Sequence, residues 1–410
     1  MRITHGVMVN GFLTDMNTNL NGLNSIRKQL NTGKVFSKPS DDPFKVARSM
    51  QMYSEINANK QYNTNIKDTI NWMDTTDTAL SNGTKVLQRI RELMVSAGNA
   101  AYGSSELAAI KDEINERVAE FGQILNTSFD GKYIFGGKDG ANRPISVTKK
   151  PVQLLGEGNK SKSEVGVGGA DSYKGNLTKL EIKEITPVDP LASPVEYTVK
   201  INDKDYTLKD DGSGNYILDT TGTDLEGLSL DFTNVIKDSP STADTWSINL
   251  KNMKNSIDIG DNENLINQSL KVEISAGVYV DYNVNASEVL KFTDVDGSEV
   301  DVMKFFDKLV NNLSSSEGKA EVVGDNLKEI DKIINNMLSI SSKVGTIQNR
   351  MESAKELNEA QNENMTEILS ANEDIDFVEK SMEMAVAQTV YMASLQTSAK
   401  VLQPSLLSYL

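Results

Sequence analysis

The sequence of 410 residues contains no cysteine and only one histidine, His5. Without cysteine, the chain can form no disulfide bond and no thiolate metal site, and it has no cysteine nucleophile. A lone histidine near the start of the chain supplies neither the two zinc ligands of an HExxH protease nor a credible catalytic triad. We therefore predict that the protein is not an enzyme and that it holds no metal ion and no cofactor.

Long apolar runs are missing as well. No stretch of about 18 apolar residues occurs, so we expect no transmembrane helix. The first thirty residues include Asn10, Asp15 and Asn17, where a secretory signal peptide needs an unbroken apolar core. Basic residues are outnumbered, with 42 Lys plus Arg against 58 Asp plus Glu. The net charge of -16 would repel nucleic acids and anionic membrane surfaces, so neither is an expected partner.

Both ends of the chain carry apolar residues at helical spacing, but only along one narrow stripe each. The stripes consist of Leu13, Met16, Leu20, Leu23 and Leu30 at one end, and of Val386, Val390, Ala393, Leu402, Leu406 and Leu410 at the other. Two such helices packed only on each other would bury little area. We therefore predict that these residues form an assembly interface with neighbouring subunits.

The distribution of charge along the sequence predicts that two lysines also contribute to this interface. Residues 24–48 hold six Lys or Arg and two Asp, a net charge of +4, whereas residues 351–390 hold ten acids and two Lys, a net charge of -8. Opposite charges of this size favour contact between the two segments during assembly, although two solvated faces would show the same pattern. Lys34 and Lys38 are the residues that we expect to contribute.

Longer helical patterns follow inside the two ends. Asp42 and Pro43 are typical of a helix start, and the seven-residue spacing that follows predicts a helix over about residues 44–98. A second helix is expected from Ser105 to about Ser128. The regular steps of three and four between Ile330 and Ala354 predict a returning helix whose apolar face is ordinary intramolecular core.

The middle of the chain has a different period. Residues 138–297 show alternating apolar and polar runs that predict strands, with a hairpin turn at 202–205, and a short helix is expected from Ser298 to Leu313. Trp246 fits a position in the core of this sheet. The fold class that we predict is α+β and elongated: an antiparallel bundle of long helices from both chain ends with an inserted, mainly β domain.

The expected domains follow from these boundaries. Residues 1–40 would form an N-terminal assembly helix that pairs with a C-terminal assembly helix, 375–410. Residues 41–137 would form a helical body with the returning helix, 314–374. Residues 138–313 would form the inserted outer domain with its closing helix.

Two patterns in the sequence resemble ligand sites but lack the spacing that such sites need. Gly136-Gly137-Lys138-Asp139 lacks the spacing and the hydroxyl of a phosphate-binding loop. Asp294, Asp296 and Asp301 miss the spacing of an EF-hand, so a calcium site is not expected.

Several short motifs at both ends resemble the flagellin family. They are Met1-Arg2-Ile3-Thr4, Pro39-Ser40-Asp41-Asp42-Pro43, the segment from Gly131 to Gly137, the segment from Val344 to Glu352, and the ending Ser405-Leu406-Leu407-Ser408-Tyr409-Leu410. The resemblance covers about residues 1–137 and 300–410. Filament-forming members usually continue the paired aspartates with Ala and an Ala-Gly pair, whereas Pro43, Phe44 and Lys45 follow here.

This resemblance implies a structural adaptor of the bacterial flagellum that joins the hook to the filament, outside the cell. The implied partners are the first hook-associated protein, flagellin, like subunits in a ring and a flagellar export chaperone, with secretion by type III export. Filament flagellin is the first alternative. A surface adhesin or glycan-binding module in the β insert, using Trp246 or Tyr279, is an alternative of another class.

Overall fold

The computed structural model describes residues 5–99, 102–155, 159–160, 163–170, 173, 177–188, 195–211, 213–238, 240–260, 262–294, 296–314 and 319–401. Its helices are α1 (His5–Thr32), α2 (Pro43–Ala97), α3 (Ser104–Ile124), α4 (Thr233–Lys237), α5 (Glu263–Ile266), α6 (Ala286–Leu290), α7 (Val302–Leu313), α8 (Lys319–Val323), α9 (Asp325–Glu373) and α10 (Phe377–Val401). Its strands are β1 (Ser128–Phe129), β2 (Lys132–Tyr133), β3 (Ile145–Leu155), β4 (Gly166–Gly168), β5 (Lys179–Pro187), β6 (Tyr197–Ile201), β7 (Lys204–Asp210), β8 (Tyr216–Leu218), β9 (Ser229–Asp231), β10 (Thr245–Ile259), β11 (Lys271–Ser275), β12 (Val278–Asp281), β13 (Lys291–Thr293) and β14 (Glu299–Asp301).

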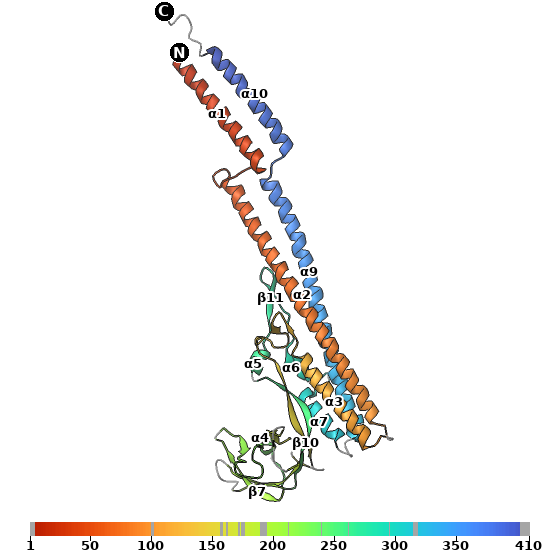
Figure 1. Ribbon diagram of the computed structural model, residues 1–410. Coiled ribbons are helices and arrows are strands. Elements are labelled where there is room, and N and C mark those ends of the chain that lie inside the picture. The colour runs from red at the N-terminus through yellow and green to blue at the C-terminus, as the bar shows by residue number, and fades with distance from the viewer. Residues whose placement is uncertain are drawn as a thin grey trace, which may run out of the picture. The chain divides into compact units, whose positions relative to one another are not determined.

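The chain divides into two compact units. The first unit consists of Met1–Ile66, Glu273–Val278 and Glu352–Leu410, and the second consists of Lys67–Val272 and Tyr279–Met351. In the first unit, α1 and α10 lie side by side and antiparallel (Figure 1). The same unit holds the first part of α2 and the last part of α9. Long helices at both ends of the chain, with a mainly β segment between them, confirm the predicted fold class.

In the loop between α1 and α2, Asp42 caps the next helix as predicted, and Asp41 holds the loop closed. The Asp41 carboxylate accepts a hydrogen bond from the backbone N–H of Ser37 at 3.0 Å, which closes the loop. The next residue, Asp42, accepts one from the backbone N–H of Lys45 at 3.1 Å. Helix α2 then begins at Pro43, one residue from the predicted start, because proline suits the first helical position, where no N–H is needed.

The helical part of the second unit has a continuous apolar seam. Met73, Leu80, Leu87 and Met94 of α2 are all fully buried, as are Ile330, Ile333, Met337 and Met351 of α9. This burial confirms that the α9 seam is intramolecular core. At Gly83, an added Cβ would lie 2.8 Å from Cε of Met337 and 3.4 Å from the ring of Phe121 in α3. The absence of a side chain at Gly83 therefore lets α2 come close to both α9 and α3.

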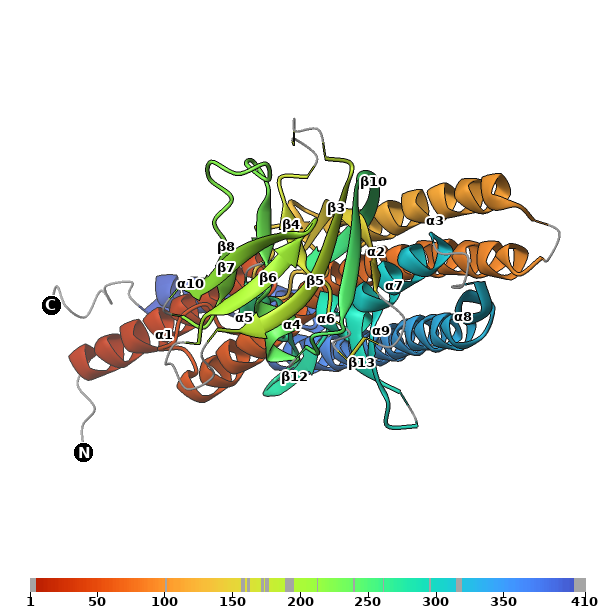
Figure 2. The ribbon, with the colours of Figure 1, turned by 90° about the horizontal axis from the view of Figure 1, so that it is seen from below.

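The β segment of the second unit is built on one antiparallel sheet of eight strands, in the order β3-β10-β5-β6-β7-β8-β9-β4. We call it the curled sheet, because its two edge strands come together: the side-chain amide of Gln153 in β3 bonds the backbone N–H and C=O of Val165, next to β4. Seventeen buried hydrophobic residues fill it, including Trp246, Phe232 and Leu230. Figure 2 shows β5 and β6 side by side in this sheet.

The predicted hairpin turn is the connection between β6 and β7. Asn202 and Asp203 both have positive φ values, 50° and 63°. A two-residue turn of this kind matches the twist of the flanking strands, and Asn and Asp tolerate the left-handed conformation.

The outer halves of β3 and β10 leave the curled sheet as a two-stranded ribbon. Ile145–Pro151 pairs there with Met253–Ile259 alone, and the ribbon packs on α3 and α7. The packing is close at Gly122 of α3, where an added Cβ would lie 2.5 Å from Cγ2 of Val147. A second glycine, Gly137, leads from the helices into this region with φ at +56°, and a Cβ there would lie 2.2 Å from the backbone oxygen of Ile266. Only glycine fits at Gly137.

Two predicted helix boundaries need correction. Helix α3 ends at Ile124 rather than near Ser128, because the chain turns back as the hairpin of β1 and β2. Helix α7 starts at Val302 rather than at Ser298. Residues Glu299–Asp301 are a strand paired with β13, and the Asp301 carboxylate then caps the helix by accepting from the backbone N–H groups of Met303 and Lys304.

Candidate assembly surface

The facing sides of α1 and α10 form a regular but weakly apolar seam. Every seam residue of α1 is partly buried, and so is every seam residue of α10 except Ser398, which is buried. The seam consists of Val9, Phe12, Met16, Asn19, Leu23, Ile26 and Leu30 in α1, and of Lys380, Met384, Ala387, Tyr391, Ser394 and Ser398 in α10. Steps of three and four residues are typical of paired helices. Among the described side chains of the two helices, no hydrophobic one is buried.

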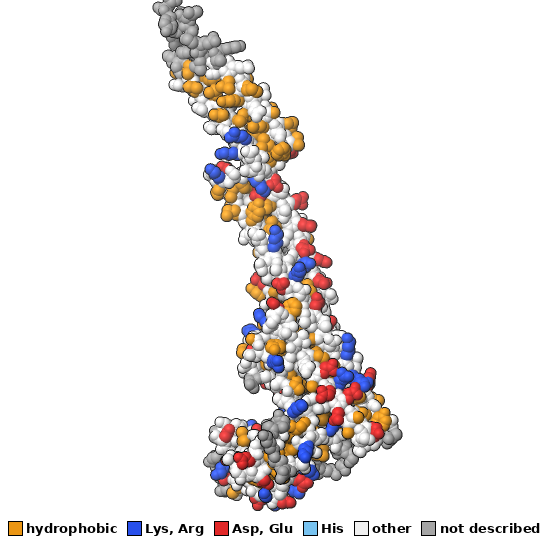
Figure 3. Space-filling view, in the orientation of Figure 1, with side chains coloured by type: hydrophobic (Ala, Val, Ile, Leu, Met, Phe, Trp, Pro, Cys, Tyr) orange, Lys and Arg blue, Asp and Glu red, His pale blue; other side chains and the backbone are white. Residues whose placement is uncertain are grey.

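The outward side of α10 is more aliphatic than the side that faces α1. Its stripe consists of Val378, Met382, Val386, Val390 and Ala393, all exposed. The exposed fraction is 63% for Val386 and 45% for Val390. Hydrophobic side chains accordingly gather on the surface over α1 and α10 (Figure 3). A helix that is apolar on more than one side is normally surrounded by protein, so this surface is suited to contact with further helices.

The structure places the predicted stripe residues on two different sides. Met16, Leu23 and Leu30 face the α1–α10 seam, whereas Leu13 and Leu20 are exposed by 40% and 38%. Val386, Val390 and Ala393 lie on the outward side of α10. Leu402, Leu406 and Leu410 lie outside the described residues. The sequence pattern could not separate the inward from the outward side, because apolar spacing alone does not say which neighbour covers it.

Lys34 lies at the elbow where the loops α1–α2 and α9–α10 meet. Its ammonium contacts Glu373 Oε1 at 2.5 Å and Asp374 Oδ1 at 2.7 Å. The backbone N–H of Val35 donates to the carbonyl of Glu373, and the N–H of Ile375 donates to the carbonyl of Gly33. The basic and acidic segments therefore meet within one chain at this point, and the Lys34 charge is already engaged there.

Glu373 and Tyr53 are elbow residues that the sequence analysis missed. The Glu373 side chain is only 7% exposed, and it also accepts a hydrogen bond from the Tyr53 hydroxyl of α2 at 2.5 Å. Hydrogen bonds to Asp374 and Glu373 raise the pKa of Lys34 above its ordinary range. The hydrogen bond from Lys34 lowers the pKa of Asp374, and the bond to Glu373 raises the pKa of Tyr53. These four side chains, which we call the elbow cluster, join α1, α2, α9 and α10.

Lys38 differs from Lys34, because its side chain is exposed. Four other basic residues of the same segment, Arg27, Lys28, Lys45 and Arg48, are exposed as well. On α9, the exposed carboxylates Glu352, Glu356, Glu359, Glu363 and Glu367 follow one another at steps of three and four residues, which places them on one face. The structure leaves these charges at the surface of the first unit.

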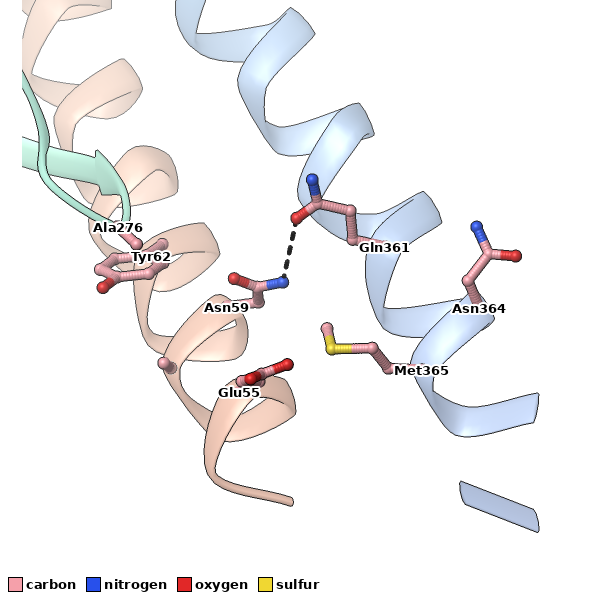
Figure 4. Close-up of a pocket in the computed structure, with 8 residues that line it drawn as sticks. Glu55, Asn59, Tyr62, Ala276, Gln361, Asn364 and Met365 are labelled. Carbon is pink, nitrogen blue, oxygen red and sulfur yellow. Dashed lines mark hydrogen bonds between the residues drawn. The ribbon is translucent and has the colours of Figure 1, made fainter. Parts of the chain in front are cut away.

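A groove of 370 Å³ also lies in the first unit (Figure 4). Its wall combines the small or apolar side chains of Ala58, Ala276 and Met365 with the ring of Tyr62. Asn59 of α2 donates a hydrogen bond of 3.4 Å to Gln361 of α9 across it. The lining offers one carboxylate, Glu55, and no cysteine or histidine, so it has no catalytic constellation.

Asp294 and Asp296, which miss the spacing of a calcium loop, both contact a lysine side chain. The Lys332 ammonium lies 3.1 Å from Asp294 and 2.5 Å from Asp296, and the hydrogen bond from Lys332 is the first cause of a lowered pKa at Asp296. In the part of the chain that the structure describes, no three His, Cys, Asp or Glu residues are grouped as metal ligands. None of the described helices is both long and apolar enough to cross a membrane.

Of the two aromatic residues considered for glycan binding, Trp246 is unavailable. Its ring is 1% exposed in the core of the curled sheet, as its place in the alternating pattern predicts, and its Nε1 donates to the carbonyl of Ser163. Tyr279 in β12 is 60% exposed.

Comparison with known proteins gives two family matches. The model of the bacterial flagellin N-terminal helical region matches residues 3–139, and the model of the bacterial flagellin C-terminal helical region matches residues 327–410. Together the two matches cover more than half of the chain. They include both long helices and the motifs at the two chain ends, but not the curled sheet.

Two curated relatives are flagellins. The chain is 28% identical over 185 residues to the flagellin of Clostridium tyrobutyricum, which covers 44% of this chain and 49% of the relative. It is 28% identical over 172 residues to the phase 1 flagellin of Salmonella naestved, covering 42% of this chain and 30% of the relative. The chain thus spans about half the length of the first and less than a third of the second.

Two solved structures also resemble the chain. A putative flagellar hook-associated protein from Vibrio parahaemolyticus has a TM-score of 0.47 at 15% identity, covering 82% of this chain and 100% of that one. Flagellar hook-associated protein 3 from Legionella pneumophila has a TM-score of 0.39 at 14% identity, covering 78% and 98%.

Proposed function

The chain belongs to the bacterial flagellin family, and from that membership we propose that it is a non-catalytic structural protein of the flagellum that joins the hook to the filament. The observation that carries the assembly role is the outward apolar stripe of α10, which the fold of the described chain leaves exposed. A monomer gains nothing from this exposure, whereas a helical array of subunits buries it.

Sequence features favour the junction over the filament. Pro43, Phe44 and Lys45 follow the paired aspartates, where filament-forming members usually continue with Ala and an Ala-Gly pair. All three residues are exposed at the start of α2. The Phe44 side chain is 79% exposed, so it is available to a different neighbour. The partners that we propose are the first hook-associated protein on one side, flagellin on the other, and like subunits within a ring.

Location on the intact organelle separates the junction protein from filament flagellin. Immunogold labelling of flagella with an antibody against the curled sheet should give a single band at the distal end of the hook. Decoration along the whole filament would contradict the proposal and support the filament role. Export through the flagellar type III apparatus, with a cytosolic chaperone on the C-terminal region, belongs to the same proposal.

The outward stripe can be tested with a matched pair of variants. Val390→Asp introduces a charge at a side chain that is 45% exposed, and Ile217→Asp does the same at one that is 47% exposed on β8. Both variants should remain folded as monomers, because neither residue is buried. Only Val390→Asp should abolish incorporation into the junction, since a charge there would have to enter an apolar contact. Equal incorporation of both variants would overturn the role of this stripe.

A further inference from the structure

One lysine of the ribbon is fully buried and belongs to none of the assembly features. The Lys254 side chain is 0% exposed, in the part of β10 that follows a register irregularity between Asn249 and Met253. A buried ammonium is costly unless it is paired and hydrogen-bonded. Two carboxyl groups from other segments contact it: Glu164, which precedes β4, and Asp307 of α7. Asn311 of α7 in turn contacts Glu164.

The distances bring an amine and two carboxyl groups into reacting range. The Lys254 Nζ atom lies 2.8 Å and 3.0 Å from the two oxygens of Glu164 and 3.3 Å from Oδ1 of Asp307. The Asn311 amide donates a hydrogen bond of 2.5 Å to Oε1 of Glu164, which also accepts from Lys254. Asn311 therefore holds the Glu164 carboxyl group next to the lysine. The carbon that the amine would attack, Cγ of Asp307, is bonded directly to this Oδ1 atom, so the amine lies next to the carboxyl group with which it would react.

Asp307 has the properties of the electrophile. Burial raises its pKa, although the Lys254 charge opposes this rise, and a raised pKa shifts the carboxyl group toward the neutral acid that an amine can attack. Its Oδ2 accepts from the Ser256 hydroxyl at 3.3 Å, whereas its buried Oδ1 makes no aligned hydrogen bond to any described group. The Oδ1 atom, with the amine beside it, is a natural leaving oxygen.

We propose that Lys254 and Asp307 condense into an intramolecular isopeptide bond, with Glu164 as the catalytic proton carrier. This activity goes beyond the proposed junction role and does not depend on it. Asn311 is a positioning residue, because it acts by holding Glu164.

The reaction balances without any external reagent. Glu164 takes a proton from the Lys254 ammonium, and the neutral amine attacks Cγ of Asp307 to form a C–N bond. Glu164 then returns its proton to the departing Asp307 oxygen. The nitrogen finally loses its excess proton to the Glu164 carboxylate. One C–O bond breaks and one water molecule leaves. No electron is transferred, so no oxidant or reductant is needed.

The fold supplies what such a condensation lacks in bulk water. Well-oriented groups reach effective molarities of roughly 10⁵–10⁸ M, and a site closed to water disfavours the reverse hydrolysis. The product would tie β10 covalently to α7, and so would fix the ribbon to the helices of the second unit. In a chain without cysteine, this bond would take the mechanical place of a disulfide.

Intact mass of the purified full-length chain tests the proposal. The folded wild type should be lighter than its sequence by one water molecule, and peptide mapping should find a branched peptide that joins the segments of Lys254 and Asp307. Lys254→Arg keeps a buried cation but removes the nucleophilic amine, so it should show the full sequence mass. Glu164→Gln should slow the mass loss strongly. A folded wild-type chain that keeps its full mass after long incubation would overturn the proposal.

Asp307→Asn provides a sharper control. This variant starts with an amide, so it would lose ammonia instead of water, yet it would form the same bond as the wild type. Its cross-linked product should therefore have the mass of the cross-linked wild type, and Asp307→Ala should give no product. Loss of water from Asp307→Ala, or loss of ammonia from the wild type, would assign the bond to Glu164 or Asn311 and would overturn the role of Asp307. Far-UV circular dichroism of each variant shows whether it is folded.

Discussion

The curled sheet and the helix pair of α1 and α10 use their apolar side chains in opposite ways. The curled sheet encloses seventeen buried hydrophobic residues, and most of them are almost completely buried. The described part of the helix pair has no buried hydrophobic side chain and exposes its more aliphatic stripe. The sheet therefore contains its own core, whereas the helix pair lacks the partner that would complete one. We therefore expect that stability in the sheet is a property of the monomer and that in the helix pair it depends on assembly.

The largest expected effect of a single substitution lies in the curled sheet. Phe232→Ala removes a fully buried ring, so we expect a loss of about 3–5 kcal/mol in the free energy of unfolding. Val386→Ala in α10 should change it by less than about 0.5 kcal/mol, because the side chain is already 63% exposed. Urea unfolding followed by the fluorescence of the buried Trp246 measures the first value, and urea unfolding followed by the helical signal in far-UV circular dichroism measures the second.

The comparison fails if the two substitutions have similar effects. A loss of several kcal/mol from Val386→Ala in the monomer would mean that α10 is covered within the chain. An unchanged midpoint for Phe232→Ala would mean that the curled sheet does not unfold as a unit with its core.

Hydrogen exchange should show the next largest contrast. Amide protons of β5 and β10 should exchange only through unfolding of the sheet. Those of α1 and α10 should exchange through local opening that needs little free energy, because little apolar area holds the pair together. In the monomer, limited proteolysis should trim both ends to a core of about residues 40–370. Equal protection of α1, α10 and the curled sheet would contradict this expectation.

Much of this contrast could be predicted from the sequence, and the rest could not for physical reasons. The α2 start, the α9 seam and the Asn202-Asp203 turn depend on local spacing and backbone preference, and the structure confirms all three. Whether Val386 faces α1 or solvent depends on a neighbour far away in the sequence. Periodicity finds the stripe but not its partner.

Lys254 shows a second limit. The alternation of Trp246, Ile248 and Leu250 places position 254 on the core side as well, but a lysine is almost never fully buried unless it is paired, so its residue type indicates a surface position. The carboxyl groups of Glu164 and Asp307 pair with it and allow its burial. These partners lie far away in the sequence, so no local pattern predicts them.

The elbow cluster should have a smaller effect on stability, confined to the first unit. Lys34→Met leaves the nearly buried Glu373 without its cation, so we expect a local loss of about 1–3 kcal/mol, lowered toward 1 by solvent at the partly exposed lysine. Faster hydrogen exchange at Val35 and Ile375 measures the opening. Lys38→Met, four residues away and exposed, is the matched control and should leave both amides unchanged. Equal exchange in the two variants would show that the elbow cluster does not stabilise the elbow.

The same cluster sets a pH window for the elbow. The pKa of Asp374 is lowered, so its contribution is present above its ordinary pKa near ~4 and is lost as the pH falls. The pKa values of Lys34 and Tyr53 are raised, so their contributions are present below about 10 and are lost as the pH rises. Exchange at Val35, corrected for the intrinsic rate, should therefore be slowest at neutral pH. In Lys34→Met, the acceleration of exchange at low pH should begin at a higher pH, near the ordinary pKa of a carboxyl group.

The smallest expected effect comes from excision of the curled sheet. Leu155 and Trp246 are paired across β3 and β10, so replacing residues 156–245 by Asn-Gly would close the ribbon as a hairpin. Trp246, Ile248 and Leu250 would lose their cover and should be changed to Thr in the same variant. Lys254 would lose Glu164 but keep Asp307 as its partner. Trp72 then remains as the sole tryptophan, packed edge-on against Phe129 and Tyr282 in the second unit.

If the curled sheet holds only its own core, the urea midpoint reported by Trp72 should hardly move, and the variant should still enter the junction and support motility. A wider cut over residues 142–295 would also remove the ribbon that packs on α3 and α7, where Gly122 meets Val147, and would expose the apolar side of α7. That wider deletion is the informative control, because it should lower the Trp72 midpoint by exposing this surface. An equally large drop after the narrow cut would show that the curled sheet stabilises the helices, and the division between a self-contained sheet and an assembly-dependent helix pair would have to be abandoned.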